Sequence, residues 1–217
     1  MPVDKKIVRP WEFGEDCIFA VCDWLGFTGV AAKEYATVTG TMTEVKTPYG
    51  TGLQCAAANS YVQFNWRARC PEGATPRTIF TYAYFPSNGN FATASFGGAA
   101  VRDYTWVGPS SPQYWGGLNG DWDAGGAGQA AGWQSYALTN AGINGGANIV
   151  YGQGVQAVAG TNGAVAVGTY GDLYLMSLRG TVNSPVGSII QVALMFRRVL
   201  AAGEIEALDD WCKGLRP

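Results

Sequence analysis

The chain has 217 residues, a formal net charge of −2 and only 14% charged residues, against roughly 25% in an average soluble domain. This length suits one well-buried all-β domain, and the near-zero net charge excludes the basic surface that nucleic-acid binding requires. Residues 1–6 are polar and no apolar run approaches about 18 residues, so we expect no secretory signal, no transmembrane helix and no membrane partner.

Short β-strands separated by turn residues are predicted along most of the chain. Residues 17–22 form a buried run, and the runs 52–56 and 60–64 flank the turn-prone pair Ala58-Asn59. The strongest strand is 77–85, which is almost entirely β-branched or aromatic and is bounded by prolines. The further predicted strands are 91–96, 101–107, 133–139, 147–151, 155–159, 164–169, 172–178 and 187–196.

Residues 108–132 are predicted to form a long loop, because Gly, Pro, Ser, Trp and Asp dominate them. Long loops in compact domains tend to be functional or interfacial. Asp121 and Asp123 are the only charged residues in this segment, so a partner could cover it without desolvating many ions. We expect a contact surface here rather than an active site.

One helix is predicted, over residues 201–215, at the end of the chain. Its apolar residues recur at steps of three or four and so share one face; they are Ile205, Leu208, Cys212 and Leu215. Glu204 and Glu206 lie in the first turn, where negative charge suits the helix dipole.

Five cysteines occur, an odd number, in a chain without a secretory signal, and both facts argue against a disulfide framework. They are Cys17, Cys22, Cys55, Cys70 and Cys212. The chain has no histidine and no Cys-x-x-Cys pair, which argues against structural zinc. We expect buried, reduced thiols.

The last predicted strand and the helix carry a recognisable pattern. Residues 190–208 read IQVALMFRRVLAAGEIEAL, residues 52–62 read GLQCAAANSYV, and residues 77–85 read RTIFTYAYF. In this order, the three segments resemble the laminin-G-like branch of the concanavalin A-like lectin/glucanase superfamily. Ala201 stands where that family usually has a capping Ser, so we expect one helix cap to be lost.

The resemblance implies an all-β fold, a two-sheet jelly-roll β-sandwich of the concanavalin A-like kind with a short C-terminal helix. We expect residues 1–14 to form an N-terminal arm and residues 15–217 to form a single domain that ends in the helix 201–215. No composition break suggests a second domain.

The superfamily includes glucanases, so paired catalytic acids must be sought. Between residues 73 and 203 the chain has no Glu, and the absence of His rules out Ser-His-Asp and Cys-His sites. We therefore expect no enzymatic activity and no cofactor. Asp121 and Asp123, two residues apart in a Gly-rich turn, could hold calcium through oxygen ligands, although a solvated loop without a metal is the favoured explanation.

Aromatic residues gather around the predicted loop and could stack on sugars or anchor a protein interface. The candidates are Trp115, Trp122, Tyr114 and Trp106. Trp106 and Trp133 also fit core strand positions, whereas Trp115 and Trp122 are expected to be exposed.

Free-standing laminin-G-like chains without a signal and with reduced thiols resemble virion proteins of tailed bacteriophages. The resemblance implies a capsid decoration (cement) or tail-associated protein that is made in the host cytoplasm and located in the virion. Its partners would be other virion proteins and copies of itself. A glycan-binding adhesin for host-surface attachment is the alternative, and a glycoside hydrolase is a third possibility.

Overall fold

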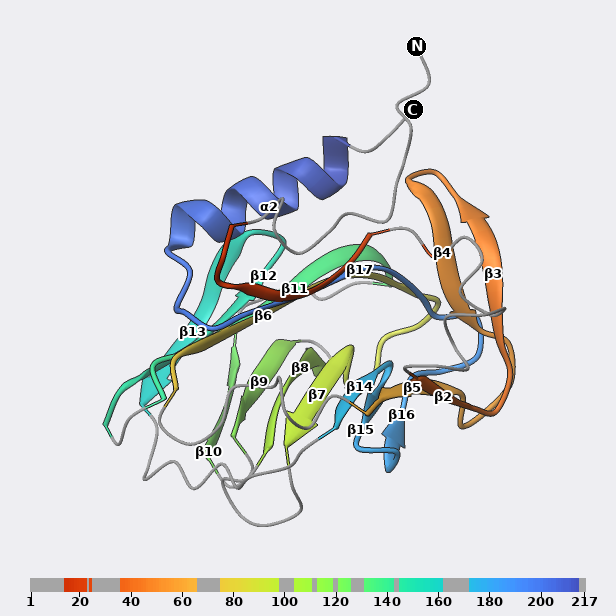
Figure 1. The fold of residues 1–217 in the computed structure, drawn as a ribbon, viewed down its shortest axis with the longest axis horizontal. Helices are drawn as coiled ribbons and strands as arrows, with labels where there is room; N and C mark the ends of the chain where they lie inside the picture. Colours follow the sequence, from red (N-terminus) through yellow and green to blue (C-terminus); the bar gives the residue numbers. More distant parts are fainter. Residues whose placement is uncertain are drawn as a thin grey trace.

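The computed structural model describes residues 14–22, 24, 36–65, 75–97, 104–110, 113–118, 121–125, 131–142, 145–161 and 172–214. Two antiparallel sheets lie face to face, and a helix covers the outer face of one of them (Figure 1). The predicted all-β sandwich with a short C-terminal helix is therefore confirmed. The predicted arm, residues 1–14, and the predicted strand 164–169 lie outside the described residues except for Gly14.

The eight-stranded sheet is called sheet A here. Its path runs through β13 (Val155–Thr161), β12 (Ala147–Gly152), β11 (Gly132–Asn140), β6 (Arg77–Phe85), β17 (Ile189–Phe196), β4 (Gly50–Cys55) and β3 (Met42–Thr47). Strand β17, the last strand of the chain, is central to the sheet, because it pairs with β6 on one edge and with both β4 and β1 (Cys17–Val21) on the other.

The seven-stranded sheet is called sheet B. Its path runs through β10 (Asp121–Gly125), β9 (Gln113–Leu118), β8 (Tyr104–Ser110), β7 (Ala94–Gly97), β14 (Leu173–Leu175), β5 (Tyr61–Phe64) and β2 (Ala36–Thr39). A small ribbon of β15 (Ser177–Leu178) and β16 (Val182–Asn183) adjoins it. The predicted strand 172–178 is thus two strands, divided at Met176, whose φ is +63°.

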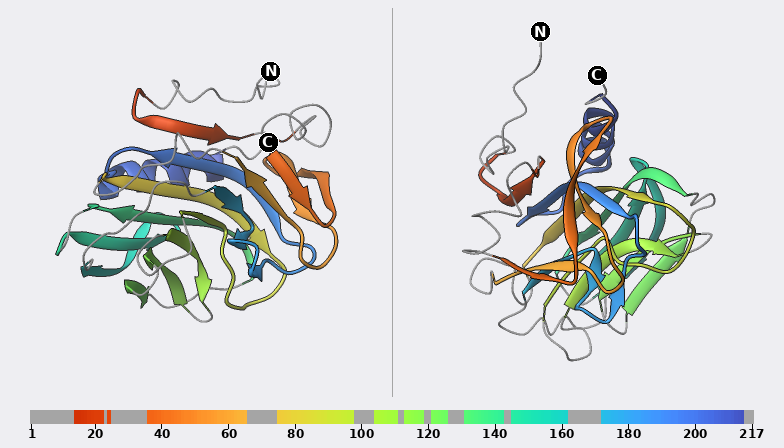
Figure 2. Two further views of the ribbon diagram at one scale, coloured as in Figure 1. Left: turned by 60° about the horizontal axis from the view of Figure 1, so that its bottom comes forward. Right: turned by 90° about the vertical axis from the view of Figure 1, so that its right-hand side faces the viewer.

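Both faces of β6 are buried, which explains its unbroken apolar sequence. Ile79 and Phe85 point into the core between the sheets, whereas Phe80 and Tyr82 point to the outer face of sheet A. Helix α2 (Ala202–Gly214) lies on that outer face (Figure 2). Its Ile205 and Cys212 are fully buried there and Leu208 is partly buried, as predicted, while Leu215 lies outside the described residues.

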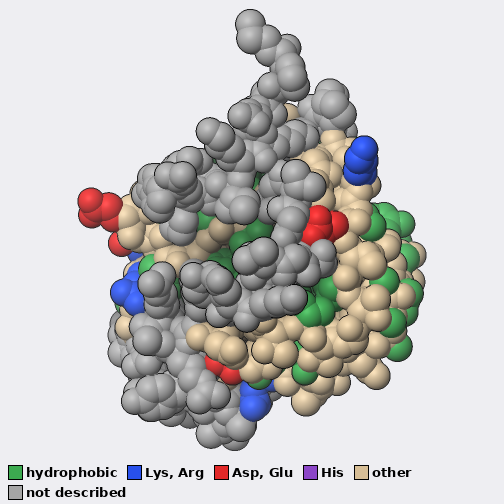
Figure 3. Space-filling model, turned by 45° about the vertical axis from the view of Figure 1, so that its right-hand side comes forward, with side chains coloured by type: hydrophobic (Ala, Val, Ile, Leu, Met, Phe, Trp, Pro, Cys, Tyr) green, Lys and Arg blue, Asp and Glu red, His purple; other side chains and the backbone are tan. Residues whose placement is uncertain are grey.

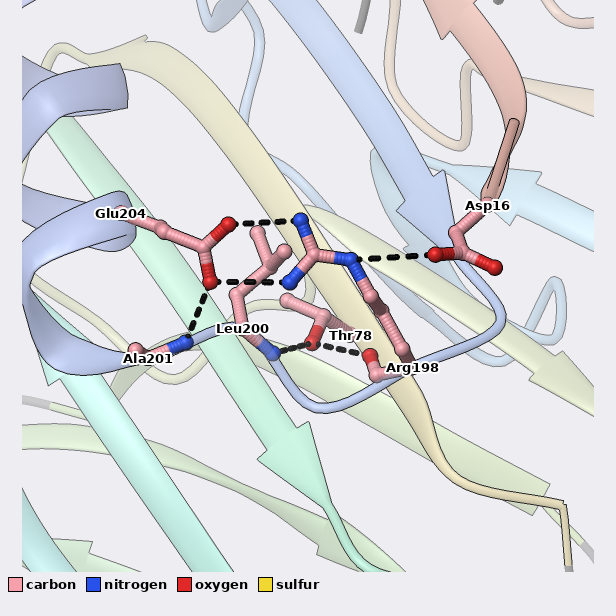
Figure 4. Close-up of polar contacts among 6 residues, drawn as sticks. All are labelled: Asp16, Thr78, Arg198, Leu200, Ala201 and Glu204. Carbon is pink, nitrogen blue, oxygen red and sulfur yellow. Dashed lines mark hydrogen bonds and ion pairs between the residues drawn. The ribbon is translucent and has the colours of Figure 1, made fainter. Parts of the chain in front are cut away.

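The start of α2 is held by Glu204 and Arg198, although the usual capping Ser is replaced by Ala201. The backbone N–H of Ala201 donates to Glu204 Oε2 at 2.8 Å, which is half of a capping box. Arg198 donates to both oxygens of Glu204, at 2.8 and 2.6 Å, and its Nε lies 3.3 Å from Asp16 Oδ2 (Figure 4). Thr78 of β6 accepts from Leu200 N–H and donates to the Arg198 carbonyl, which fixes the strand-to-helix turn.

The pH dependence of the free energy of unfolding should reveal the ion pair between Arg198 and Glu204. Hydrogen bonds from Arg198 lower the pKa of Glu204 from 4.5 to about 2. A carboxylate with a lowered pKa in the folded state stabilises the fold above its unfolded pKa, and the contribution is lost as the pH falls towards about 2. We expect urea unfolding of the parent and Glu204→Gln to differ by a constant amount above pH 5 and to converge near pH 2. A difference that does not change with pH would contradict this.

Candidate functional site

The segment predicted as a long loop, 108–132, is instead mostly an antiparallel meander at one edge of sheet B. Strand β9 pairs with β8 on one side and with β10 on the other. Glycines in these strands allow a neighbouring backbone to approach more closely than any side chain would permit. A Cβ on Gly116 would lie 2.8 Å from the Trp106 carbonyl oxygen, and one on Gly108 would lie 2.2 Å from the Phe91 carbonyl oxygen. The glycine-rich composition therefore reflects close strand packing, and the loop prediction is wrong.

Cross-strand register places three of the predicted tryptophan positions on one face of this meander. Trp106 lies opposite Gly117, and Gly117 lies opposite position 122. Trp115, two residues before Gly117, is on the same face, because side chains alternate along a strand. This is the face of sheet B that points away from sheet A, since neighbouring Val107 points into the core. We call positions 106, 115, 117 and 122 the tryptophan face.

The two described indoles of the tryptophan face contact each other. Their ring centroids are 5.6 Å apart in an edge-to-face arrangement, and Trp115 donates from Nε1 to the Phe91 carbonyl at 2.9 Å. Trp106 is 3% exposed and Trp115 is partly buried, so both are less exposed than a free anchor would be. The prediction that Trp115 is an exposed residue is corrected accordingly. The side chain of Trp122 lies outside the described residues.

Tyr114 does not belong to this face. It points between the sheets, where its hydroxyl donates to Gln134 Oε1 at 2.7 Å and its ring packs 5.8 Å from that of Tyr136. Burial raises the pKa of its phenol. Tyr114 is therefore a core residue that joins the two sheets, and its assignment as a contact residue is wrong.

Asp121 and Asp123 lie on strand β10 rather than in a Gly-rich turn, so the turn predicted for calcium is corrected. Being two residues apart, they share one face of the strand, the opposite face to position 122. Their side chains lie outside the described residues. Within the described part of the chain, no three His, Cys, Asp or Glu residues are grouped closely enough to hold a metal ion.

The described acids near the centre of the fold are each engaged with another side chain. Asp172 accepts from Gln63 Nε2 at 2.6 Å, and Asp209, buried on α2, is paired with Lys213.

A recess of about 210 Å³ lies beside α2 and is lined by Phe196, Arg198, Leu200, Glu204, Ala207 and Leu208. Figure 3 shows another face of the molecule, on which a few acidic and basic side chains are scattered over a mostly uncharged surface.

Sequence reasoning missed an aromatic cluster on the outer face of sheet A. Trp133, one of the two tryptophans assigned to core strand positions, stacks on Tyr82 with centroids 5.5 Å apart and an interplanar angle of 19°. Tyr49, from the β3–β4 turn, packs edge-on against Trp133 at 5.0 Å, and Tyr84 lies 5.7 Å from it. The i, i+2 spacing of Tyr82 and Tyr84 in the sequence shows that they share a face, but not which face.

The thiols should be reduced and protected. Cys17, Cys22, Cys55 and Cys212 are free and buried, and burial raises the pKa of Cys17 to about 11 and that of Cys55 to about 12. Since the thiolate is the reactive form, we expect these four not to react with Ellman's reagent at pH 8 until the protein unfolds. Denatured, unreduced protein should titrate all five cysteines of the sequence, including Cys70, and a titre of one would contradict the prediction.

The sequence matches no family model and no curated protein. Its fold resembles domain 4 of AbnA, a GH43 extracellular arabinanase from Geobacillus stearothermophilus solved with arabinotriose. The TM-score is 0.59 at 16% identity, covering 80% of this chain and 87% of that one. The binding domain of botulinum neurotoxin serotype D has a TM-score of 0.61 at 11% identity, and the match covers 81% of this chain and 46% of that one. Trypanosoma rangeli sialidase has a TM-score of 0.60 at 14% identity, and the match covers 83% of this chain and 30% of that one.

These likenesses establish the β-sandwich fold alone, because all the identities are low. This chain spans about half of the toxin domain and less than a third of the sialidase. The similar structures include chains from enzymes as well as binding domains. Among the described residues, no helix is long and apolar enough to cross a membrane.

Proposed function

We propose that this chain is a non-catalytic structural protein of a tailed-bacteriophage virion, either a capsid decoration (cement) protein or a tail-associated protein. In this proposal the tryptophan face contacts other virion proteins or another copy of the chain. The observation that carries the proposal is the edge-to-face pair of Trp106 and Trp115 on glycine-rich strands at the edge of sheet B, in which Trp115 is partly exposed.

Aromatic residues and low charge are the features that distinguish the centre of a protein interface from the remaining surface. Trp115 is held rigidly by its hydrogen bond to Phe91 and by its contact with Trp106, so little side-chain entropy is lost when a partner covers it.

The non-catalytic part of the proposal is supported by the engagement of four of the described acids with other side chains. A retaining glycosidase needs two carboxyl groups about 5–5.5 Å apart and open to the substrate. Glu204 and Asp16 are bridged by Arg198, Asp172 accepts from Gln63, and Asp209 is buried beside Lys213. These four carboxylates therefore have structural partners.

The virion setting is supported by the laminin-G-like sequence pattern and by the buried free thiols, which suit folding in a reducing cytosol.

Fractionation of cells that produce the chain tests the proposal. We expect the chain to sediment with DNA-containing particles. Ala124→Arg, on β10 directly opposite Trp115, should fold but leave the particle fraction. Val186→Arg is the matched control, because Val186 is 52% exposed in the turn between β16 and β17, outside strands β8–β10, and it should remain with the particles.

Two results would overturn the proposal. In the first, the parent chain is found only in the soluble fraction. In the second, the parent is retained on whole cells and released by a glycan, which would identify a host-surface adhesin. A steady turnover of any polysaccharide by the purified chain would overturn its non-catalytic part.

A further inference from the structure

The recess beside α2 is large enough to hold one aromatic side chain. Its volume is about 210 Å³, and a cavity of about 150 Å³ already accommodates benzene. Phe196, Leu200 and Leu208 give it apolar walls. The two charged residues in its lining, Arg198 and Glu204, are bonded to each other, so their charges are already paired. The recess therefore favours an apolar occupant.

The described part of the chain begins at the edge of this recess. The Asp16 carboxylate lies 3.3 Å from Arg198 Nε, and the Asp16 carbonyl accepts from the Arg197 N–H at 2.9 Å (Figure 4). Residues 1–13 lie outside the described residues and join them at Gly14. An extended chain spans about 3.3–3.6 Å per residue, so the five steps back from Asp16 to Trp11 reach up to about 17 Å. Trp11 is therefore within reach of the recess.

Trp11 is the residue of this N-terminal segment that is best suited to the recess. The segment reads MPVDKKIVRPWEF, and its indole is the largest apolar side chain in it. Burying an indole removes more apolar surface from water than burying any of the aliphatic side chains of the segment. Pro10, directly before Trp11, has a fixed φ, so less backbone entropy is lost when the segment is ordered.

The charges of the N-terminal segment and of α2 are complementary. Residues 1–9 contain three basic residues and one acid, which are Lys5, Lys6, Arg9 and Asp4. Helix α2 contains four acids and one basic residue, which are Glu204, Glu206, Asp209, Asp210 and Lys213. Glu206 and Asp210 are exposed, so they are available to the basic residues of the segment. Such exposed pairs contribute little energy each, but they favour one placement of the segment over others.

We propose that Trp11 occupies the recess beside α2 of its own chain, with residues 5–9 alongside the acidic side chains of the helix. The docked segment covers the apolar walls that α2 and β17 leave open. The recess is on the outer side of sheet A, whereas the tryptophan face is on sheet B, so the inference does not rest on the proposed function. Docking leaves the tryptophan face open to a partner.

Limited digestion with trypsin tests the docking. Trypsin cuts after Lys5 and Lys6, whereas Pro10 blocks the cut after Arg9, and mass spectrometry follows the loss of residues 1–6. Cleavage reports the fraction of molecules in which the segment is undocked, so we expect Trp11→Ala and Ala207→Arg to lose these residues about tenfold faster than the parent. Ala207→Arg acts by filling the recess. Ala202→Arg is the matched control, because Ala202 is exposed on α2 outside the recess, and it should be cut at the parent's rate.

A disulfide trap distinguishes docking within one chain from docking on a second copy. Cys70→Ser first removes the one cysteine that lies outside the described residues. Glu12→Cys and Ala207→Cys then place one thiol beside Trp11 and one on the wall of the recess. Oxidation with copper phenanthroline should join them within one chain. Glu12→Cys combined with Val186→Cys, at an exposed turn, should stay reduced under the same conditions.

Three outcomes would overturn the inference. The parent loses residues 1–6 as fast as Trp11→Ala does, or Ala202→Arg accelerates the cut as much as Ala207→Arg, or the disulfide joins two chains, which would identify exchange between copies. Melting temperatures confirm folding, and the disulfide trap keeps Trp11, so it decides the matter if Ala207→Arg is unstable. None of these variants lies on β8–β10, so this inference and particle attachment through the tryptophan face fail separately.

Discussion

Ile205→Ala is expected to lower the free energy of unfolding by about 2–5 kcal/mol. Ile205 is fully buried where α2 meets the outer face of sheet A, in a cluster with Phe80, Leu194 and Phe196. The substitution leaves a cavity that rigid strands cannot fill. Urea unfolding at pH 7 gives the value directly.

Glu206→Ala is the control on the same helix, because Glu206 is exposed. It should change the free energy of unfolding by no more than about 0.5 kcal/mol. If Ile205→Ala is as mild as this control, α2 is not an integral part of the sandwich. Deleting residues 201–217 should then leave the melting temperature unchanged.

Gly152→Ala is expected to destabilise the fold by about 1–3 kcal/mol, as overpacking of a filled core does. A Cβ at this position of β12 would lie 2.2 Å from the ring of Tyr114. The ring cannot move away freely, because its hydroxyl is bonded to Gln134 and its face packs against Tyr136. The two sheets would therefore have to shift relative to each other.

Gly203→Ala, the same change in the first turn of α2, should act in the opposite direction. Nothing lies within 4 Å of a Cβ built there, and helical backbone favours Ala over Gly. We expect a gain of about 0.5–1 kcal/mol, measured in the same urea titrations. If both variants shift stability in the same direction, the close approach of Tyr114 to β12 is not what Gly152 accommodates.

Local sequence was sufficient to predict the elements that are buried on both faces or along one helical face. Strand β6 was predicted correctly because both of its faces are buried, and α2 because one face is apolar at helical spacing. Buried Asp209 was not anticipated, although Lys213 lies four residues later, because apolar periodicity carries no information about buried charged side chains. Strands β2 and β3 were missed because they are only partly buried and contain few apolar residues, although their threonines favour strands.

The meander β8–β10 shows why the composition of residues 108–132 led to the wrong prediction of a long loop. Gly, Pro and Trp favour loops statistically, yet Gly108 and Gly116 lie in strands that approach a neighbouring backbone too closely for any side chain. The placement of Trp106 and Trp115 on one face, and of Tyr114 between the sheets, follows from alternation along β8 and β9. That alternation becomes visible only when the strands and their register are known.

Photocrosslinking tests the central claim, that the tryptophan face is a contact surface, most directly. Benzoylphenylalanine would be placed at position 122 in one chain and at position 186 in a second, and each would be irradiated in the cells that normally make the protein. Benzophenone reacts with C–H groups of proteins and sugars alike, so the partner need not be known beforehand. We predict a discrete adduct from position 122 and none from the exposed control position 186. Equal labelling at both positions, or an adduct from 186 alone, would contradict the claim.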